Sequence, residues 1–216
     1  MSKKTELIKV FKDYKTQHNN FQAEKNAINN NLAYTLEGKD LAIKELIKKY
    51  NPVIQSFQSK AVQLINDGAD ELNATWKNKS VGRLVESGYQ AGLANVIKML
   101  EIGVIQEKEE LQFIIVTYAD DFNALSMIKK MTNNAANHKN EKLKSVVYPT
   151  DNRVENRELL EQLRGNVEKY ISVDTVKYVS KQWNTFNQNV VDVSSCMDSM
   201  AEFVETRLGD DLQLLN

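Results

Sequence analysis

The sequence predicts an all-α protein: an elongated bundle of about six helices, with long coiled-coil-like helices at both ends. Glycine occurs 8 times and proline twice among 216 residues, too few turn formers for the many corners of a β-sandwich or barrel. Large side chains also recur at alternating spacings of three and four residues, which is the helical period. With 42% hydrophobic and 26% charged residues, the chain can bury a core.

The first fifty residues are expected to form one helix, from about Lys4 to Tyr50. Two residues per heptad on one seam are typical of a coiled coil, although His18 and Lys25 make this seam imperfect. The pattern slips by one residue near Gly38, where we expect the helix to change the face it presents. The seam consists of Leu7, Phe11, Tyr14, His18, Phe21, Lys25, Ile28, Leu32 and Thr35.

A break is expected at Asn51 and Pro52, followed by a second helix that reaches about Trp76. Proline is tolerated at the first position of a helix, and asparagine is a good cap before it. The alternative is a kink within one longer rod.

The middle of the chain predicts two further helices. The first has Ser80 as its cap and ends at Gly103, a left-handed stop. The second begins after Glu107 and ends near Met131, and its continuing helical spacing favours a helix over a strand for the apolar segment at 113–118. The acidic pair at 120–121 is interpreted as solvated charge, because adjacent helical residues point in different directions.

The chain is expected to divide into a helical region at 1–131, a flexible linker at 132–150 and a C-terminal helical hairpin at 151–216. The linker prediction rests on the polar, aperiodic residues that begin this segment. Asp174 is expected to cap the last helix, whose seam is regular up to a stop at Gly209.

The two ends of the chain differ in charge. Residues 1–50 contain ten Lys and six Asp or Glu, a net charge of +4, whereas 174–211 contain three Lys or Arg and seven Asp or Glu, a net charge of −4. Opposite charge guides helix pairing, so we expect these segments to pack together, within one chain or between subunits.

The sequence contains no motif specific for catalysis or cofactor binding. A phosphate-binding loop and a nucleophile elbow are both missing, and we assign no catalytic residue, cofactor or metal ligand. His18 is interpreted as a packing residue, with a pH-sensitive role as the alternative. Cys196 is interpreted as a small packing residue, because its neighbours offer no basic group to activate a thiol.

The function expected from these observations is that of a non-catalytic structural or interaction protein that acts as an oligomer through helix–helix surfaces. An assembly, scaffold or virion-associated component of phage or bacterial origin fits this description. The alternative is a nucleic-acid-associated or regulatory protein that uses the basic N-terminal helix, although a net charge of −1 gives no general attraction to nucleic acid. An enzyme with an unrecognised site is a third hypothesis.

The expected location is the cytoplasm, because the N-terminus lacks the apolar run of a signal peptide and no stretch is apolar enough to span a membrane. The expected partner is another protein or a second copy, bound through the helical seams, without membrane contact. The apolar stripe of the last helix can serve as core or as a surface for a partner. The candidate interaction residues are Phe11, Tyr14, Phe21, Ile28, Trp183, Phe186, Met197 and Met200.

Overall fold

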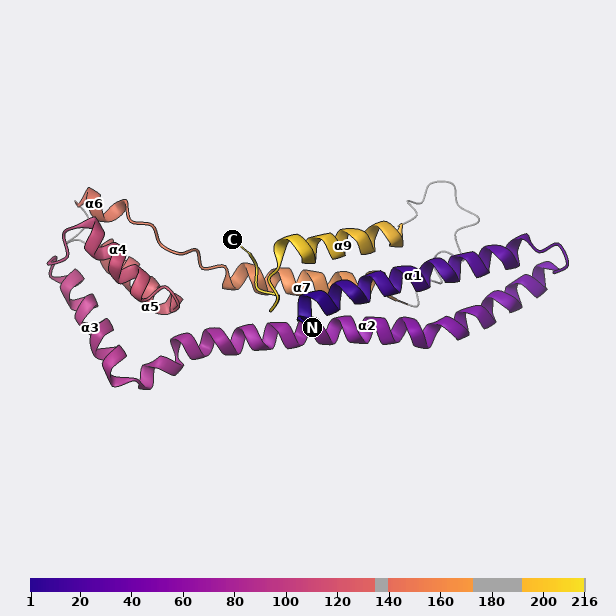
Figure 1. Ribbon diagram of the computed structural model, residues 1–216, viewed down its shortest axis with the longest axis horizontal. Coiled ribbons are helices and arrows are strands. Elements are labelled where there is room, and N and C mark those ends of the chain that lie inside the picture. Colours follow the sequence, from indigo (N-terminus) through magenta and orange to yellow (C-terminus); the bar gives the residue numbers. More distant parts are fainter. Residues whose placement is uncertain (135–139, 173–191, 216) are drawn as a thin grey trace. The chain divides into compact units, whose positions relative to one another are not determined.

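The computed structural model describes residues 1–134, 140–172 and 192–215, and in these residues the fold is all-α (Figure 1). The described residues form eight α-helices and one short 3₁₀ helix, and contain no strand beyond an isolated bridge. The chain divides into two compact units. Unit 1 comprises 1–70 and 153–216, and unit 2 comprises 71–152, so unit 2 is an insertion between the two halves of unit 1.

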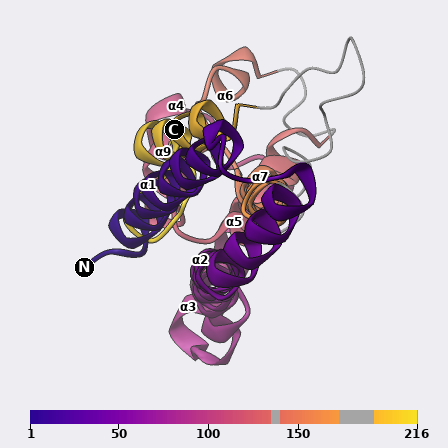
Figure 2. The ribbon, with the colours of Figure 1, turned by 90° about the vertical axis from the view of Figure 1, so that its right-hand side faces the viewer.

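Unit 1 is formed by α1 (Lys3–Asn30), most of α2 (Leu36–Ser80), α7 (Arg153–Tyr170) and α9 (Val193–Arg207). In the view along the helices, α1 lies next to α9 and α2 lies next to α7 (Figure 2). Helices α1 and α2 run antiparallel, since the ring of Phe21 contacts Tyr50 at 5.4 Å and the ring of Tyr14 contacts Phe57 at 6.1 Å.

The chain reverses direction at residues 31–35, which corrects the prediction of one helix up to Tyr50. The side chain of Asn31 accepts a hydrogen bond from the Ala33 amide, and Thr35 Oγ1 accepts one from the Gly38 amide. These bonds satisfy backbone groups that a helix terminus leaves free. The slip in the seam near Gly38 therefore marks a turn between two helices rather than a change of face within one.

Pro52 lies inside α2, so the alternative of one longer rod is correct at this position. A proline removes the hydrogen bond to the carbonyl four residues earlier, here that of Lys48. Lys48 and Pro52 are both exposed, so water can reach this carbonyl. The neighbouring Tyr50 and Ile54 are buried, and their packing against the rest of unit 1 favours continuation of the helix through Pro52.

The C-terminal segment after α9 folds back on itself and is held by α1 and α7. Leu208 and Leu214 form an isolated antiparallel bridge. The buried side chain of Asn156 donates to the Leu212 carbonyl at 3.3 Å and accepts from the Leu214 amide at 2.7 Å. Lys4 Nζ donates to the Leu208 carbonyl at 2.7 Å. The segment is therefore an integral part of unit 1.

Unit 2 contains the end of α2 and five short helices: η1 (Gly82–Val85), α3 (Ser87–Glu101), α4 (Lys108–Thr117), α5 (Phe122–Thr132) and α6 (Glu141–Lys144). The segment at 113–118 lies in and directly after helix α4, as predicted, and Gly103 has the left-handed φ of 70° expected of a helix stop. The hydrophobic core of unit 2 consists of Leu93, Leu100, Ile105, Leu111, Ile115, Tyr118, Ala124, Leu125, Ile128, Leu143 and Val146.

Three boundaries in unit 2 differ from the sequence-based expectation. Ser80 ends α2 instead of capping a new helix, and the helix predicted from 107 to 131 is interrupted before Asp121, which caps α5. Two residues of the expected linker, Leu143 and Val146, are buried in the core. The predicted start of the last helix at Asp174 lies outside the described residues.

Candidate functional site

Most of the candidate interaction residues lie in the interior of unit 1. Phe11, Tyr14 and Phe21 on α1 are fully buried, and Ile28 is half-buried. Met197 and Met200 on α9 are also buried. Trp183 and Phe186 lie outside the described residues. The described members of this set thus contribute to the core between the helices of the chain itself.

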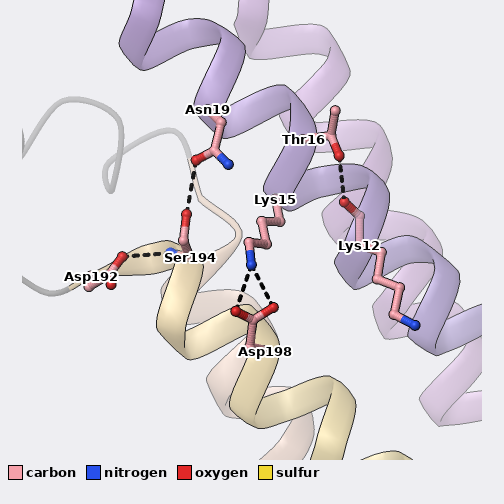
Figure 3. A network of polar contacts seen from close by, with 7 residues as sticks. All are labelled: Lys12, Lys15, Thr16, Asn19, Asp192, Ser194 and Asp198. Carbon is pink, nitrogen blue, oxygen red and sulfur yellow. Dashed lines mark hydrogen bonds and ion pairs between the residues drawn. The ribbon is translucent and has the colours of Figure 1, made fainter.

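Helices α1 and α9 pack in an antiparallel register that polar contacts define (Figure 3). Lys15 Nζ donates to both carboxylate oxygens of Asp198, at 2.8 and 2.6 Å. One turn further along, Ser194 Oγ donates to Asn19 Oδ1 at 2.9 Å. This is the pairing that the opposite charges of the two ends predict, formed here within one chain.

The N-terminus of α9 begins beside this contact. Asp192 caps the helix, and its Oδ1 accepts a hydrogen bond from the Ser194 amide at 3.0 Å (Figure 3). A carboxylate at this position satisfies a free backbone amide and is favoured by the helix dipole. The α9 terminus is therefore fixed at the level of Asn19 on α1.

The lysines of α1, which the nucleic-acid alternative needs, are largely engaged within the chain. Lys4 binds the Leu208 carbonyl, Lys9 pairs with Asp13, and Lys15 pairs with Asp198. Lys12 extends away from α9 (Figure 3). A phosphate-binding surface requires several cations that are free to contact phosphates, so this arrangement gives the alternative no support.

His18 and Lys25 are buried on the inner face of α1, as the seam predicts. The Nδ1 atom of His18 has no hydrogen-bond partner within the part of the chain that the structure describes. Burial lowers the pKa of His18, Asp192 acts against this shift, and the nearby charge of Lys25 adds to it. Burial also lowers the pKa of Lys25. Both groups are thus placed where a positive charge is disfavoured.

Cys196 on α9 is half-buried, and its surroundings do not activate it. Burial raises the pKa of the thiol, the charge of Asp192 raises it further, and Lys169 acts in the opposite direction. A nucleophilic cysteine requires a lowered pKa. The environment therefore favours the neutral thiol.

Asp121 is the centre of a polar cluster in unit 2 that the sequence interpretation missed. Asp121 as a whole residue is only 3% exposed. Oδ1 accepts from Ser80 Oγ at 2.8 Å and from the amides of Asn123 and Ala124, and Oδ2 accepts from the Tyr89 hydroxyl at 2.6 Å. Burial by itself raises the pKa of Asp121, but these hydrogen bonds outweigh it and lower the pKa. The four bonds join α2, α3 and α5.

Tyr89 extends this cluster towards α3 and η1. Burial raises its pKa, and the hydrogen bond to Asp121 raises it further. The Arg83 guanidinium lies over the Tyr89 ring at 3.8 Å from the centroid, and the Tyr118 ring lies at 5.4 Å. The cluster is closed by aromatic packing, which indicates a structural role.

The outer surface of unit 2 carries two adjoining apolar side chains, which we call the knob. They are Phe113 and Val116 on α4, which are 75% and 65% exposed. They lie one turn apart, on the face opposite Leu111 and Ile115, which contact the core. A shallow hollow of about 330 Å³ lies beside them.

A second hollow of unit 2, which we call the groove, lies between α3 and α5. It has a volume of about 440 Å³, and most of its lining surface is apolar. Met127, on the α5 side, is 50% exposed. Lys98 and Glu101 lie at its polar edge and pair at 3.0 Å. The groove is lined by Gln90, Leu93, Ala94, Ile97, Lys98, Glu101 and Met127.

Metal-binding and membrane-spanning features were searched for in the same described residues. No group of three or more His, Cys, Asp or Glu side chains there is arranged to hold a metal ion. None of the helices there combines the length and the apolar character needed to cross a bilayer.

Comparison with protein-family models, with curated proteins and with solved structures finds no match to this chain.

Proposed function

We propose that this protein is a non-catalytic structural component of an assembly, and that it acts by association of helical surfaces between copies of the chain. The exposed knob on α4 carries the proposal. Single exposed apolar side chains are common on protein surfaces, but Phe113 and Val116 adjoin one another and share a unit with an apolar groove. Surfaces of this kind are typical of protein–protein interfaces, where aromatic residues are enriched.

The organisation of the chain supports the same proposal. Unit 1 buries its long helices against one another, and unit 2 is inserted into it between α2 and α7. The described seam residues of α1 and α9 pack within the chain itself and are buried or half-buried there. An interface with another copy is therefore expected on the outer surface, where Phe113 and Val116 of unit 2 are exposed, as are Leu32 and Leu36 of unit 1.

Light scattering on a sizing column, over a range of protein concentrations and at low and high salt, tests this proposal. We expect a mass above the 24.7 kDa of one chain that rises with concentration. The association should persist at high salt, because apolar contacts are not screened by ions. A mass of one chain at every concentration and salt would contradict the proposal.

A further inference from the structure

We propose that protonation of His18 on α1 opens the first turns of α9, so that the contact between these two helices responds to pH. His18 lies at the level where α9 begins, because the next residue of α1, Asn19, accepts a hydrogen bond from Ser194 Oγ at 2.9 Å (Figure 3). The inference concerns a contact within one chain and does not depend on association between copies.

The imidazole of His18 is buried, and one of its two nitrogens is unpaired. The residue is 8% exposed, and Nε2 lies 3.3 Å from the side-chain nitrogen of Gln22. Nδ1 has no hydrogen-bond partner among the residues that the structure describes. A protonated imidazole carries a hydrogen on both nitrogens, so the charged form places a donor in this interior without an acceptor for it.

The charges next to His18 do not compensate for the loss of water. Asp192 favours the charged imidazole, but its carboxylate is engaged as the cap of α9 and accepts from the Ser194 amide. Lys25, two turns along the same face of α1, is itself buried and disfavours a second positive charge. Burial is the largest effect, and the pKa of His18 is lowered.

Other titratable groups on the helices packed around α1 do not change charge near neutral pH. Tyr14 on α1, Tyr50 on α2 and Cys196 on α9 have raised pKa values, chiefly because they are removed from water, and keep their protons. Lys169 on α7 is a cation whose charge acts on Cys196. Within this set, His18 is the group that gains a proton as the pH falls from 7.5 to 5.5.

The start of α9 is the part of this packing that opens at the lowest cost. Helix ends open more readily than helix interiors, and the contact between Ser194 and Asn19 is exposed to water. On α2, by contrast, the ring of Tyr50 packs against Phe21 of α1 inside the core. Release of the first turns of α9 gives water access to the imidazole and restores its ordinary pKa of 6.5.

Proton binding therefore favours the open form at low pH. The closed form has the lower pKa, so the open form binds more protons as the pH falls below 6.5, and opening becomes more frequent. The increase between pH 7.5 and pH 5.5 has an upper limit of about tenfold, which is set by the ordinary pKa of the group.

Amide hydrogen exchange of the full chain, followed by NMR between pH 5.5 and 7.5, measures this opening. The reporters are the amides of Ser194 and Cys196, which donate to the side chain and the carbonyl of Asp192. Each rate is divided by the intrinsic exchange rate at that pH. We expect opening to increase several-fold towards pH 5.5, whereas the amides of α3 in unit 2 should show no such change.

Three variants separate His18 from other sources of pH dependence. His18→Gln should remove the increase, whereas His138→Gln, which replaces the other histidine of the chain, should leave it unchanged. Asp192→Asn keeps a side chain that caps a helix but cannot be protonated in this range. The increase should persist in Asp192→Asn, since it does not arise from protonation of the cap.

An NMR titration of the His18 imidazole in the wild type provides a test without substitution, and a pKa of 6.5 or above would overturn the inference. So would opening that is equal at every pH, an increase that survives His18→Gln, or an increase that is lost in His138→Gln or Asp192→Asn. If the amides of α1 and α2 open together with Ser194, all of unit 1 responds, and the assignment to the start of α9 is wrong.

Discussion

Leu212 packs directly against Gly68, in a notch that the missing side chain of this glycine leaves in α2. A Cβ atom at position 68 would lie 2.8 Å from Cδ1 of Leu212, 3.3 Å from its Cγ and 3.5 Å from its Cβ. Leu212 is completely buried and has a φ of 66°, a region that residues other than glycine rarely occupy. The close fit therefore keeps a strained residue in place and attaches the C-terminal segment to α2.

Gly68→Ala is expected to destabilise unit 1. Overpacking typically costs about 1–3 kcal/mol, whereas replacing a helical glycine by alanine gains about 1 kcal/mol or less. The Leu212 side chain is completely buried on a residue of positive φ, so a shift that relieves the contact has to disturb the neighbouring packing. Denaturant unfolding followed by circular dichroism should show a net loss of stability. Gly165→Ala on α7 is the control, because a Cβ there meets nothing within 4 Å and should be neutral or stabilising.

Asn156→Ala is expected to release the C-terminal segment. The variant leaves the Leu212 carbonyl and the Leu214 amide without their side-chain partner in a buried site, which costs about 1–3 kcal/mol. Amide exchange at Leu214 should accelerate, and the free energy of unfolding should fall. Asn166→Ala, at an exposed position of the same helix, should change stability by no more than about 0.5 kcal/mol. Equal effects of the two substitutions would show that the contact does not stabilise the fold.

Asp121→Ala is expected to destabilise unit 2. It removes the cap of α5 and leaves the buried hydroxyl of Ser80 and the half-buried hydroxyl of Tyr89 without their acceptor, a combined loss of about 2–4 kcal/mol. Hydrogen exchange should accelerate in α3 and α5. The neighbouring Asp120 is exposed, so Asp120→Ala should have little effect. Unchanged protection in α3 would contradict the assignment of Asp121 as the residue that joins these helices.

Packing rather than charge is expected to hold α9 on α1. A double-mutant cycle on Lys15 and Asp198 should give a coupling below about 1 kcal/mol, because the Asp198 side chain is exposed and salt screens the pair. Met197→Ala should cost about 2–5 kcal/mol, because it empties a buried site. A coupling larger than the effect of Met197→Ala would reverse this ranking.

The stability of unit 1 is expected to fall as the pH drops below 6.5. Burial lowers the pKa of His18 in the folded chain, so between the two pKa values the unfolded chain binds more protons and stability decreases with decreasing pH. Asp192 and Lys25 are the charged groups that shift this pKa, and the Tyr14 ring lies 6.1 Å from the imidazole. Unfolding measured between pH 5 and 8 should show this slope. His18→Gln should flatten it, and an unchanged slope would assign it to other groups.

The sequence predicted the inner face of α1 well, because a helical seam is a local property. The spacing of Phe11, His18 and Lys25 placed all three on one side, and all three are buried. The spacing also places Leu32 in the seam, but this residue lies beyond the end of α1 at Asn30, so the pattern did not show where the helix ends. The three consecutive asparagines at 29–31 and the capping residue Thr35 were the signal for the turn.

The candidate site was less predictable from the sequence. Asp120 and Asp121 are equivalent in composition and spacing, yet one is exposed and the other is a buried cap with four donors. The difference depends on Ser80 and Tyr89, which are distant in sequence and approach only in the folded unit. Phe113 likewise belongs to an apolar run in the sequence, and only the packing of α4 shows which members of the run remain exposed.

The sequence by itself determined that the chain is helical and which side chains of α1 lie inside, because helical period and capping act over a few residues. Only the tertiary structure decided where the chain reverses and which helices meet. Pro52 continues a helix because Tyr50 and Ile54 are buried on either side of it. Gly68 has no side chain and so leaves space for Leu212, which comes from near the C-terminal end of the chain. Such choices depend on burial and on contacts between distant segments, which no local pattern encodes.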